Sequence, residues 1–373
     1  MSDRYPFPVG SLDDASADEG GFRRHDETGP RDPRFRFSLQ LPARWRPLGR
    51  CGEAPTGRNP IACLARYAPV DEPGAEVVVT ARLLAREVAP ADVLQIELER
   101  RGEQILDLRP LDSPDGSSIG VLSRRRTGSG DLVLRRSAVK QANRMLILQA
   151  AATAESYDRW AERLAVIAAG LRFLQPGRWH CAEALSTLSR KRPSDFLLFY
   201  PESWRLEEPV AASPGLLSAC LVSKARDRAV GRMDLAVASR AALLGPHALA
   251  DGYFTSLRAA GFEGPPIRLT PSPAPAAFQL AWEGAGERTS GDTRVEVRLR
   301  VGQRPEAWFC FALIGPTRQG APDVWAVNRR ALELAFDLVA TPDVPMQGWI
   351  AEAIEGSRRP PAQARPRSSA RSA

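Results

Sequence analysis

The chain has 373 residues, enough for two ordinary domains that each bury a hydrophobic core. Apolar residues make up 43% and charged residues 25%, which is typical of a globular protein and excludes a largely disordered chain. Lys and Arg outnumber Asp and Glu by 51 to 44, and so mild an excess does not indicate a nucleic-acid-binding protein.

The chain begins with a polar, acidic stretch that lacks the basic and apolar segments of a secretory signal. We expect residues 1–34 to be disordered. No run of about 18 uninterrupted apolar residues occurs, so no membrane span is predicted. These observations favour a cytoplasmic protein, and the excess of Arg, Ala and Pro favours a bacterial one. The five cysteines form no C-x-x-C pair and are expected to be small buried apolar residues.

A short pattern occurs twice, as LPARWR at 41–46 and as YPESWR at 200–205. We expect the Pro of each copy to end a strand, because proline cannot continue a central hydrogen-bond ladder. The Trp that follows is expected to pack over the sheet edge. The segments after the two copies also match in order, which is the signature of an internal repeat.

Each copy is predicted to contain the same series of strands and helices, from the spacing of apolar residues. The first copy has strands at 61–67, 76–84 and 105–111, a hairpin over 131–153, and helices at 89–102 and 155–173. The matching segments of the second copy are 217–224, 232–244, 266–271, 293–315, 245–262 and 322–339. The two final hairpins align Gln141 with Gln303.

Short hairpin-like connections imply antiparallel sheets, so the predicted fold class is α+β, with two tandem copies of an antiparallel sheet flanked by helices. The predicted organisation is a disordered segment at 1–34, a first domain at 35–174, a linker at 175–195, a second domain at 196–342, and a short helix with a basic disordered tail at 343–373.

One face of the first sheet is predicted to be partly apolar on its outer side. In the second copy, the apolar residues of 295–301 alternate with charged residues, so one face is core and the other polar. The same register places Leu132, Leu134, Arg136 and Ala138 outside in the first copy. We predict that these four residues, with Arg298 and Arg300, bind a partner. The alternative is that they pack against the second domain or a helix and bind nothing.

No catalytic set is recognisable. The three histidines, His25, His180 and His247, have no second ligand at metal-binding spacing. The chain has no nucleophile elbow, phosphate-binding loop or zinc-protease motif. We therefore predict no catalytic residue, no cofactor and no metal site, and a protein that is not an enzyme.

The pattern F-x-L-x-x-P-x-x-W at 37–45, repeated at 196–204, resembles the start of the PsbP-like (DcrB-related) superfamily. That resemblance implies an antiparallel sheet flanked by helices and a long C-terminal helix. The superfamily includes exported DcrB-like proteins, photosystem subunits, Ran-binding proteins and the Eag chaperones of type VI secretion. The lack of an export signal disfavours the exported members and the photosystem subunits, and the bacterial composition disfavours the Ran-binding proteins. The chain therefore most resembles the Eag chaperones, which bind transmembrane segments of effectors.

The predicted function is a non-catalytic chaperone or adaptor that binds an apolar helical segment of a protein client, such as a type VI secretion effector. The alternatives are a carrier of a small apolar ligand and an enzyme whose site the sequence does not reveal. No specific nucleic acid is expected as a partner. The basic C-terminal tail is expected to contact anionic surfaces weakly. The client and the oligomeric state are left open.

Overall fold

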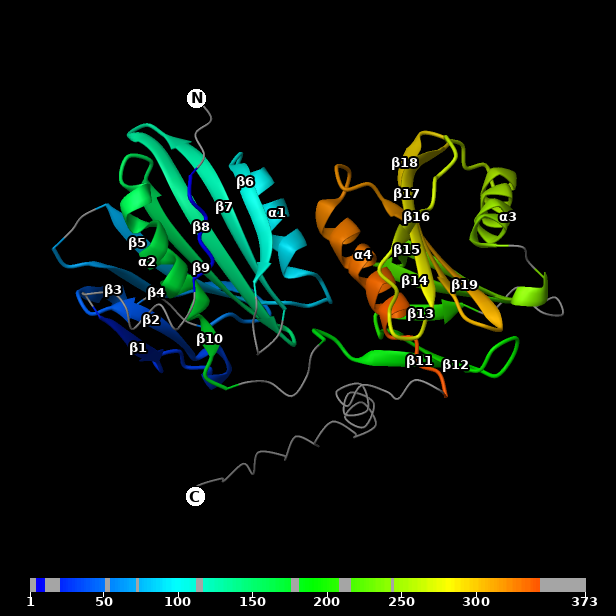
Figure 1. Ribbon diagram of the computed structural model, residues 1–373, viewed down its shortest axis with the longest axis horizontal. Coiled ribbons are helices and arrows are strands. Elements are labelled where there is room, and N and C mark those ends of the chain that lie inside the picture. The colour runs from blue at the N-terminus through cyan, green and yellow to red at the C-terminus, as the bar shows by residue number, and fades with distance from the viewer. Residues whose placement is uncertain are drawn as a thin grey trace, which may run out of the picture.

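The computed structural model describes residues 5–10, 21–50, 54–71, 74–111, 117–175, 181–207, 216–242 and 245–342. These residues form two halves that lie side by side, each built on a seven-stranded antiparallel sheet (Figure 1). The fold class is α+β, as predicted from the sequence.

The first sheet has the strand order β3-β4-β5-β9-β8-β7-β6. Its strands are β3 (Trp45–Arg50), β4 (Ile61–Pro69), β5 (Ala75–Leu83), β6 (Gln104–Leu111), β7 (Ser117–Thr127), β8 (Gly130–Gln141) and β9 (Arg144–Thr153). Consecutive strands pair as hairpins, except where a helix connects β5 to β6 and β9 joins β5 in the centre.

The second sheet has the order β13-β14-β15-β19-β18-β17-β16, which is the order of the first sheet repeated along the chain. Its strands are β13 (Trp204–Glu207), β14 (Leu216–Ala225), β15 (Arg228–Ser239), β16 (Thr270–Ser272), β17 (Leu280–Ser290), β18 (Thr293–Gln303) and β19 (Ala307–Pro316). Trp45 and Trp204 each begin the edge strand of their sheet, and they follow strands that end at Pro42 and Pro201.

Helices cover both faces of each sheet. In the first half these are α1 (Pro90–Arg100) and α2 (Tyr157–Ala169), and in the second half α3 (Pro246–Ala259) and α4 (Pro322–Asp337). Short strands lie beside α2 and α4: β1 (Phe22–Glu27), β2 (Phe37–Pro42) and β10 (Arg172–Phe173) in one half, and β11 (Leu185–Arg190) and β12 (Phe196–Pro201) in the other. Two single turns, Pro33–Phe35 and Arg240–Ala242, complete the regular structure.

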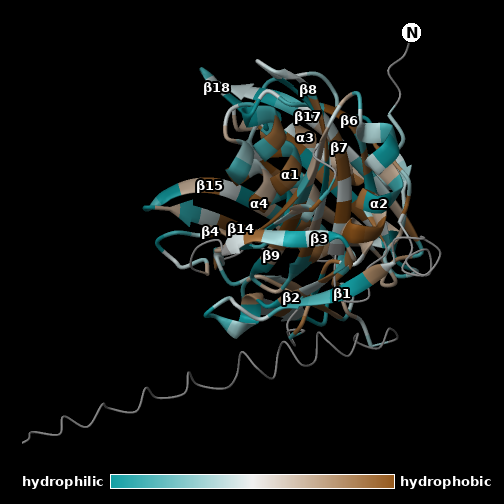
Figure 2. Cartoon of the chain, turned by 90° about the vertical axis from the view of Figure 1, so that its left-hand side faces the viewer, coloured by the Kyte–Doolittle hydropathy of each residue, from teal (hydrophilic) through white to brown (hydrophobic). Residues whose placement is uncertain are grey.

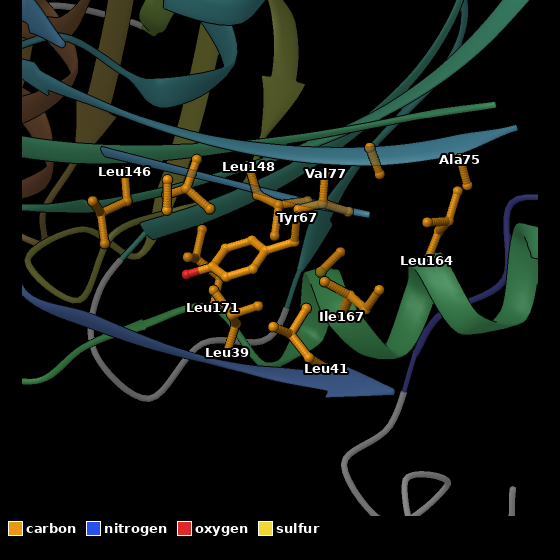
Figure 3. Close-up of a cluster of buried hydrophobic side chains, with 14 of the residues drawn as sticks. Leu39, Leu41, Tyr67, Ala75, Val77, Leu146, Leu148, Leu164, Ile167 and Leu171 are labelled. Carbon is orange, nitrogen blue, oxygen red and sulfur yellow. The ribbon is translucent and has the colours of Figure 1, made fainter. Parts of the chain in front are cut away.

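The core of the first half lies between the sheet, α2 and β2. Figure 3 shows Leu39 and Leu41 of β2 and Ile167 of α2 on the side of the sheet where Tyr67 lies, and Leu164 of α2 beside Ala75. The Trp45 ring meets the Trp160 ring edge-on, with centroids 5.9 Å apart. The matching core of the second half includes Trp204 and is closed by α4. The repeated Pro and Trp therefore form a structural corner in each half.

The two halves meet where α1 and α4 lie side by side (Figure 1). Trp325 and Ala326 of α4 belong to the same buried cluster as Val93 and Leu94 of α1 and Ala138 of β8. Helix α4 therefore closes the core of the second half and also covers part of the outer face of the first sheet.

The predicted disorder of residues 1–34 is wrong for the described part of that segment. Phe7 is buried in the first core, and β1 pairs with β2. The predicted linker at 175–195 also contains a strand, β11, which pairs with β12. Short segments of this kind lack a periodic pattern of their own and are ordered by long-range contacts. The predicted helix and tail at 343–373 lie outside the described residues, and the domain limits 35–174 and 196–342 stay a prediction.

The predicted alignment of Gln141 with Gln303 is off by one residue. Gln141 pairs with Arg144 across a two-residue turn, and its counterpart is Arg304, whose backbone N donates to the Ala307 carbonyl oxygen at 2.9 Å. A shift of one residue along a strand exchanges the two faces of a sheet. For that reason the arginines assigned to one surface from the sequence lie on different faces.

Hydrophobic segments run through α2 and the neighbouring strands, whereas hydrophilic segments lie at the periphery (Figure 2). Among the described residues, none of the helices combines the length and apolar character needed to span a membrane.

Candidate functional site

The predicted partner-binding face of β8 is covered within the protein. Leu134 and Ala138 are fully buried, and Leu132 is half-buried. Arg136 is also buried, and its Nη1 and Nη2 donate to the Glu103 carboxylate at 2.8 and 2.9 Å. Helix α1 and the start of α4 pack on this face, which is the alternative that the sequence had left open. A role of these four residues in binding a partner stays a prediction.

Arg298 and Arg300 lie elsewhere, in an open cleft of the second half. The cleft has a volume of about 460 Å³ and lies between α4 and the outer strands of the second sheet. Its lining residues are Arg268, Thr270, Glu283, Gly284, Ala285, Arg298, Leu299, Arg300, Arg329, Leu332, Glu333 and Asp337. The cleft exists because α4 packs on β15 and β19 and leaves this side of β16 to β18 uncovered.

Ion pairs fix the wall of the cleft that α4 forms. Arg300 Nη1 lies 2.8 Å from Asp337 Oδ1, and its guanidinium carbon is 4.2 Å from the centre of the Phe336 ring. Partial desolvation raises the pKa of Asp337, while the positive charge of Arg300 opposes that rise. Arg329 Nε lies 2.8 Å from Glu333 Oε1. The contacts of Arg300 tie α4 to β18, whereas the Arg329–Glu333 pair lies within α4.

Two charged side chains at the mouth of the cleft form no ion pair within the described residues. Arg268 and Glu283 are both exposed, and within the described residues neither has an ion-pair partner. Arg298 lies deeper, paired with Glu296, and its guanidinium carbon is 5.2 Å from the centre of the Trp325 ring. The cleft can therefore offer a ligand one unpaired cation, one unpaired anion and several fixed polar walls.

Ion pairs at the junction between the halves reach the cleft through Arg329. Arg329 Nη1 lies 2.8 Å from Asp92 Oδ1 on α1, and Arg318 Nη2 lies 2.7 Å from Glu99 Oε1. Burial raises the pKa of Asp92, and Arg329 opposes the rise. Arg329 thus connects the cleft to the first half.

A second buried cluster lies at the same junction. Lys140 Nζ lies 2.8 Å from Glu87 Oε1, and Arg330 of α4 approaches the same carboxylate at 3.4 Å. Because each charge in this cluster has a partner, its burial is compatible with a stable fold. We interpret the cluster as a structural tie between the two halves.

The described residues offer little for nucleophilic or metal chemistry. They contain no cluster of three His, Cys, Asp or Glu side chains that could hold a metal ion. Burial raises the pKa of the Cys181 thiol to about 11 and those of Cys220 and Cys310 to about 12, so these thiols are protonated at neutral pH. No Ser, Cys, His or Lys occurs among the described residues that line the cleft.

The sequence prediction named Arg298 and Arg300, which line the cleft, but none of the other lining residues. Arg329, Glu333 and Asp337 recur every four residues on α4, which places them on one face of the helix. That spacing was a detectable signal. Arg268 and Glu283 had no such signal in the sequence, because only the folded sheet brings them together.

No protein-family model matches the chain, and no curated protein matches it. Among solved structures, it is similar to the solution structure of cyanobacterial PsbP (CyanoP) from Synechocystis sp. PCC 6803, with 9% identity over 42% of this chain and 95% of that chain, at a TM-score of 0.33. It is also similar to the apo immunity protein TplEi of T6SS from Pseudomonas aeruginosa, with 13% identity, 81% and 98% coverage, and a TM-score of 0.24. A third match is the Tle4–Tli4 complex, with 13% identity, 81% and 99% coverage, and a TM-score of 0.23.

Proposed function

We propose that this protein is a non-catalytic adaptor or chaperone that binds a protein partner through the cleft of its second half. The observation that carries the proposal is the open, charged cleft, whose walls are fixed by Arg300–Asp337 and Arg329–Glu333. Fixed walls favour binding, because little conformational entropy is lost when a partner docks.

The chemistry of the cleft favours a polypeptide over a small apolar ligand or the substrate of a covalent enzyme. Pockets for small apolar ligands are lined mainly by hydrophobic and aromatic side chains. This cleft is lined by four arginines and three carboxylates, with Leu299 and Leu332 as its only large apolar residues among those described. Covalent catalysis needs a nucleophile beside a base, and the lining provides only arginine, carboxylate, threonine and small or apolar side chains.

An apolar helix of a secretion effector remains the second candidate for the partner. Its support is a set of exposed large apolar side chains on and beside the edge strands. Leu48 and Leu206 lie on the edge strands β3 and β13, Ile61 and Leu216 begin the neighbouring strands β4 and β14, and Val70 follows β4. Edge strands with exposed apolar residues can accept a partner segment. These residues do not line the cleft.

The test uses the full chain and purified proteins encoded beside its gene, including any secretion effector. We expect one of them to form a stoichiometric complex in size-exclusion chromatography with light scattering, and hydrogen exchange to slow in α4 and β17. Slower exchange confined to β3 and β13 would contradict the cleft as the contact site. Failure of every candidate to form a complex would contradict the adaptor proposal. For an effector that binds, equal recovery with and without its apolar helices would exclude the apolar-helix partner.

A further inference from the structure

The first half contains a filled counterpart of the open cleft. Residues 5–10 run across the first sheet beside α2 (Figure 1). Phe7 is 8% exposed, and two guanidinium carbons lie over its ring, that of Arg109 at 4.2 Å and that of Arg135 at 4.6 Å from the ring centre. Tyr5 meets Tyr157 of α2 edge-on at 5.9 Å. An extended, aromatic segment therefore occupies this position in one half.

The strand ladders show that Arg135 and Arg298 occupy equivalent positions. In the first sheet, Tyr67 lies two residues before the residue that pairs with Trp45. Tyr67 pairs with Val77, Val77 with Ala150, and Ala150 with Arg135. In the second sheet, Leu221 lies two residues before the residue that pairs with Trp204, and the pairs continue from Leu221 to Met233, Leu313 and Arg298. The arginine that stacks on Phe7 thus has a counterpart at the cleft of the second half.

The helices correspond as well. Arg172 pairs with Ser38 after α2, and Ala340 pairs with Leu197 after α4. Ser38 and Leu197 each lie four residues before the strand-ending proline, so the two pairs are equivalent. Counting back along the helices matches Tyr157 with Trp325. The same count matches Ala161, Ala165 and Ala169 with Arg329, Glu333 and Asp337.

The occupying segment contacts this face of α2. A Cβ atom placed on Gly10 would lie 2.2 Å from the Ala165 carbonyl oxygen, so the two backbones are in direct contact. The equivalent face of α4 carries Glu333, which lines the cleft. The open cleft therefore lies where the first half holds residues 5–10.

The alanines on α2 and the charged residues on α4 fit two kinds of bound segment, one from the same chain and one from another protein. Residues 5–10 belong to the same chain, so they bind at high effective concentration and need only small alanines and aromatic stacking. A segment of another protein lacks that advantage. The unpaired Arg268 and Glu283 at the mouth can supply charged contacts to it.

We propose that the cleft of the second half binds an extended segment of a partner protein that carries an aromatic side chain, in the manner in which the first half holds Tyr5 to Gly10. The aromatic ring stacks on the guanidinium groups of Arg268 and Arg298, and the backbone lies along α4. This inference rests on the proposed function and specifies the ligand of the same site.

The test uses a fluorescent peptide with the sequence of residues 5–10, YPFPVG, added to the full chain. We expect saturable binding by fluorescence anisotropy, at least tenfold weaker for the peptide with the Phe7→Ala change. The protein variants Ala285→Trp, which fills the cleft, and Arg268→Glu should each weaken binding at least tenfold. Arg294→Glu is the matched control, because Arg294 lies on the same sheet outside the cleft and is 70% exposed. It should bind like the unchanged protein.

Binding that survives both Ala285→Trp and Arg268→Glu would mean that the peptide exchanges with residues 5–10 in the first half, and it would overturn the inference. Absence of saturable binding, or equal binding of the alanine peptide, would also overturn it. In those cases a stoichiometric complex with a whole partner protein would still support the adaptor function, so the two failures are distinguishable. Circular dichroism of each variant confirms that it is folded.

Discussion

Trp325 Nε1 donates a hydrogen bond of 3.0 Å to a carboxylate oxygen of Glu296, and the same indole packs against α1 of the other half. The bond fixes the ring between the second sheet and the first half. Arg318 and Arg329 also place guanidinium carbons 5.3 and 5.5 Å from its centre. Trp325 therefore couples the second sheet to the first half.

Replacing Trp325 with alanine should uncouple the halves. Truncating a buried aromatic residue costs about 3–5 kcal/mol, and here the loss falls on the junction. We expect scanning calorimetry to resolve two thermal transitions for Trp325→Ala. Trp325→Phe is the control, because it keeps an aromatic ring at the junction and loses the hydrogen bond and only part of the packed surface, so its loss of stability should be smaller than that of the alanine variant. A single transition at an unchanged temperature in the alanine variant would show that the junction does not depend on this ring.

Removing Arg329 should destabilise the protein in a pH-dependent way. Arg329→Ala leaves the buried Asp92 carboxylate without its partner, at a cost of about 3–5 kcal/mol when that carboxylate is charged. Burial already raises the pKa of Asp92 above its unfolded value, and without Arg329 it rises further. The native state then binds more protons than the unfolded state between these two pKa values. The stability of the variant should therefore fall as the pH rises through that window.

Urea unfolding at pH 5 and pH 8 measures this effect, with a larger loss expected at pH 8. The control is Arg100→Ala, because the Arg100–Asp323 pair is 54% and 63% exposed and is expected to contribute less than about 1 kcal/mol. Equal losses at both pH values would mean that Asp92 is not the group left unpaired.

Phe7→Ala should destabilise the first half by about 3 kcal/mol, because a buried ring that contacts Arg109 and Arg135 is lost. Val9→Ala is the matched control, since Val9 is 66% exposed and its truncation should change stability by less than about 0.5 kcal/mol. Thermal unfolding of the two variants makes the comparison. If both variants melt at the temperature of the unchanged protein, residues 5–10 do not contribute to the core.

Three thiols with raised pKa values, of which Cys310 is buried and Cys181 and Cys220 are half-buried, should resist alkylation in the native protein. Their raised pKa values of about 11 to 12 leave little thiolate at pH 8, and thiolate is the reactive form. We expect peptide mapping after brief iodoacetamide treatment to find Cys181, Cys220 and Cys310 largely unmodified, and all three modified in urea. Rapid native modification of Cys310 would contradict its complete burial.

The local pattern of the sequence predicted much of the fold. The paired Pro42–Trp45 and Pro201–Trp204 segments identified the same corner in both halves, and the helical spacing of Trp160, Leu164 and Ile167 identified the buried face of α2. These signals succeed because they depend on neighbouring residues and on the period of a helix or strand.

The site could not be predicted in the same way. The cleft exists because no helix covers this side of β16 to β18 among the described residues. The equivalent position in the first half is filled by residues 5–10, which lie far from that sheet in the sequence. The match of Gln141 with Gln303 was reasonable by residue type, but one residue of error was enough to exchange the faces of β18. Trp325 gave a normal helical signal and yet packs toward the other half.

Helix α4 is buried on two sides at once, through Phe336 toward the second sheet and through Trp325 toward the first half. Each residue of an α-helix turns the chain by about 100°. A single insertion or deletion between Trp325 and Phe336 would therefore rotate one of these faces away from its partner, and no repacking of one half alone would restore both. Insertions and deletions should be tolerated in the loops of either half but should destabilise the fold when they fall in α4. A change of sequence in α4 therefore affects the packing of both halves.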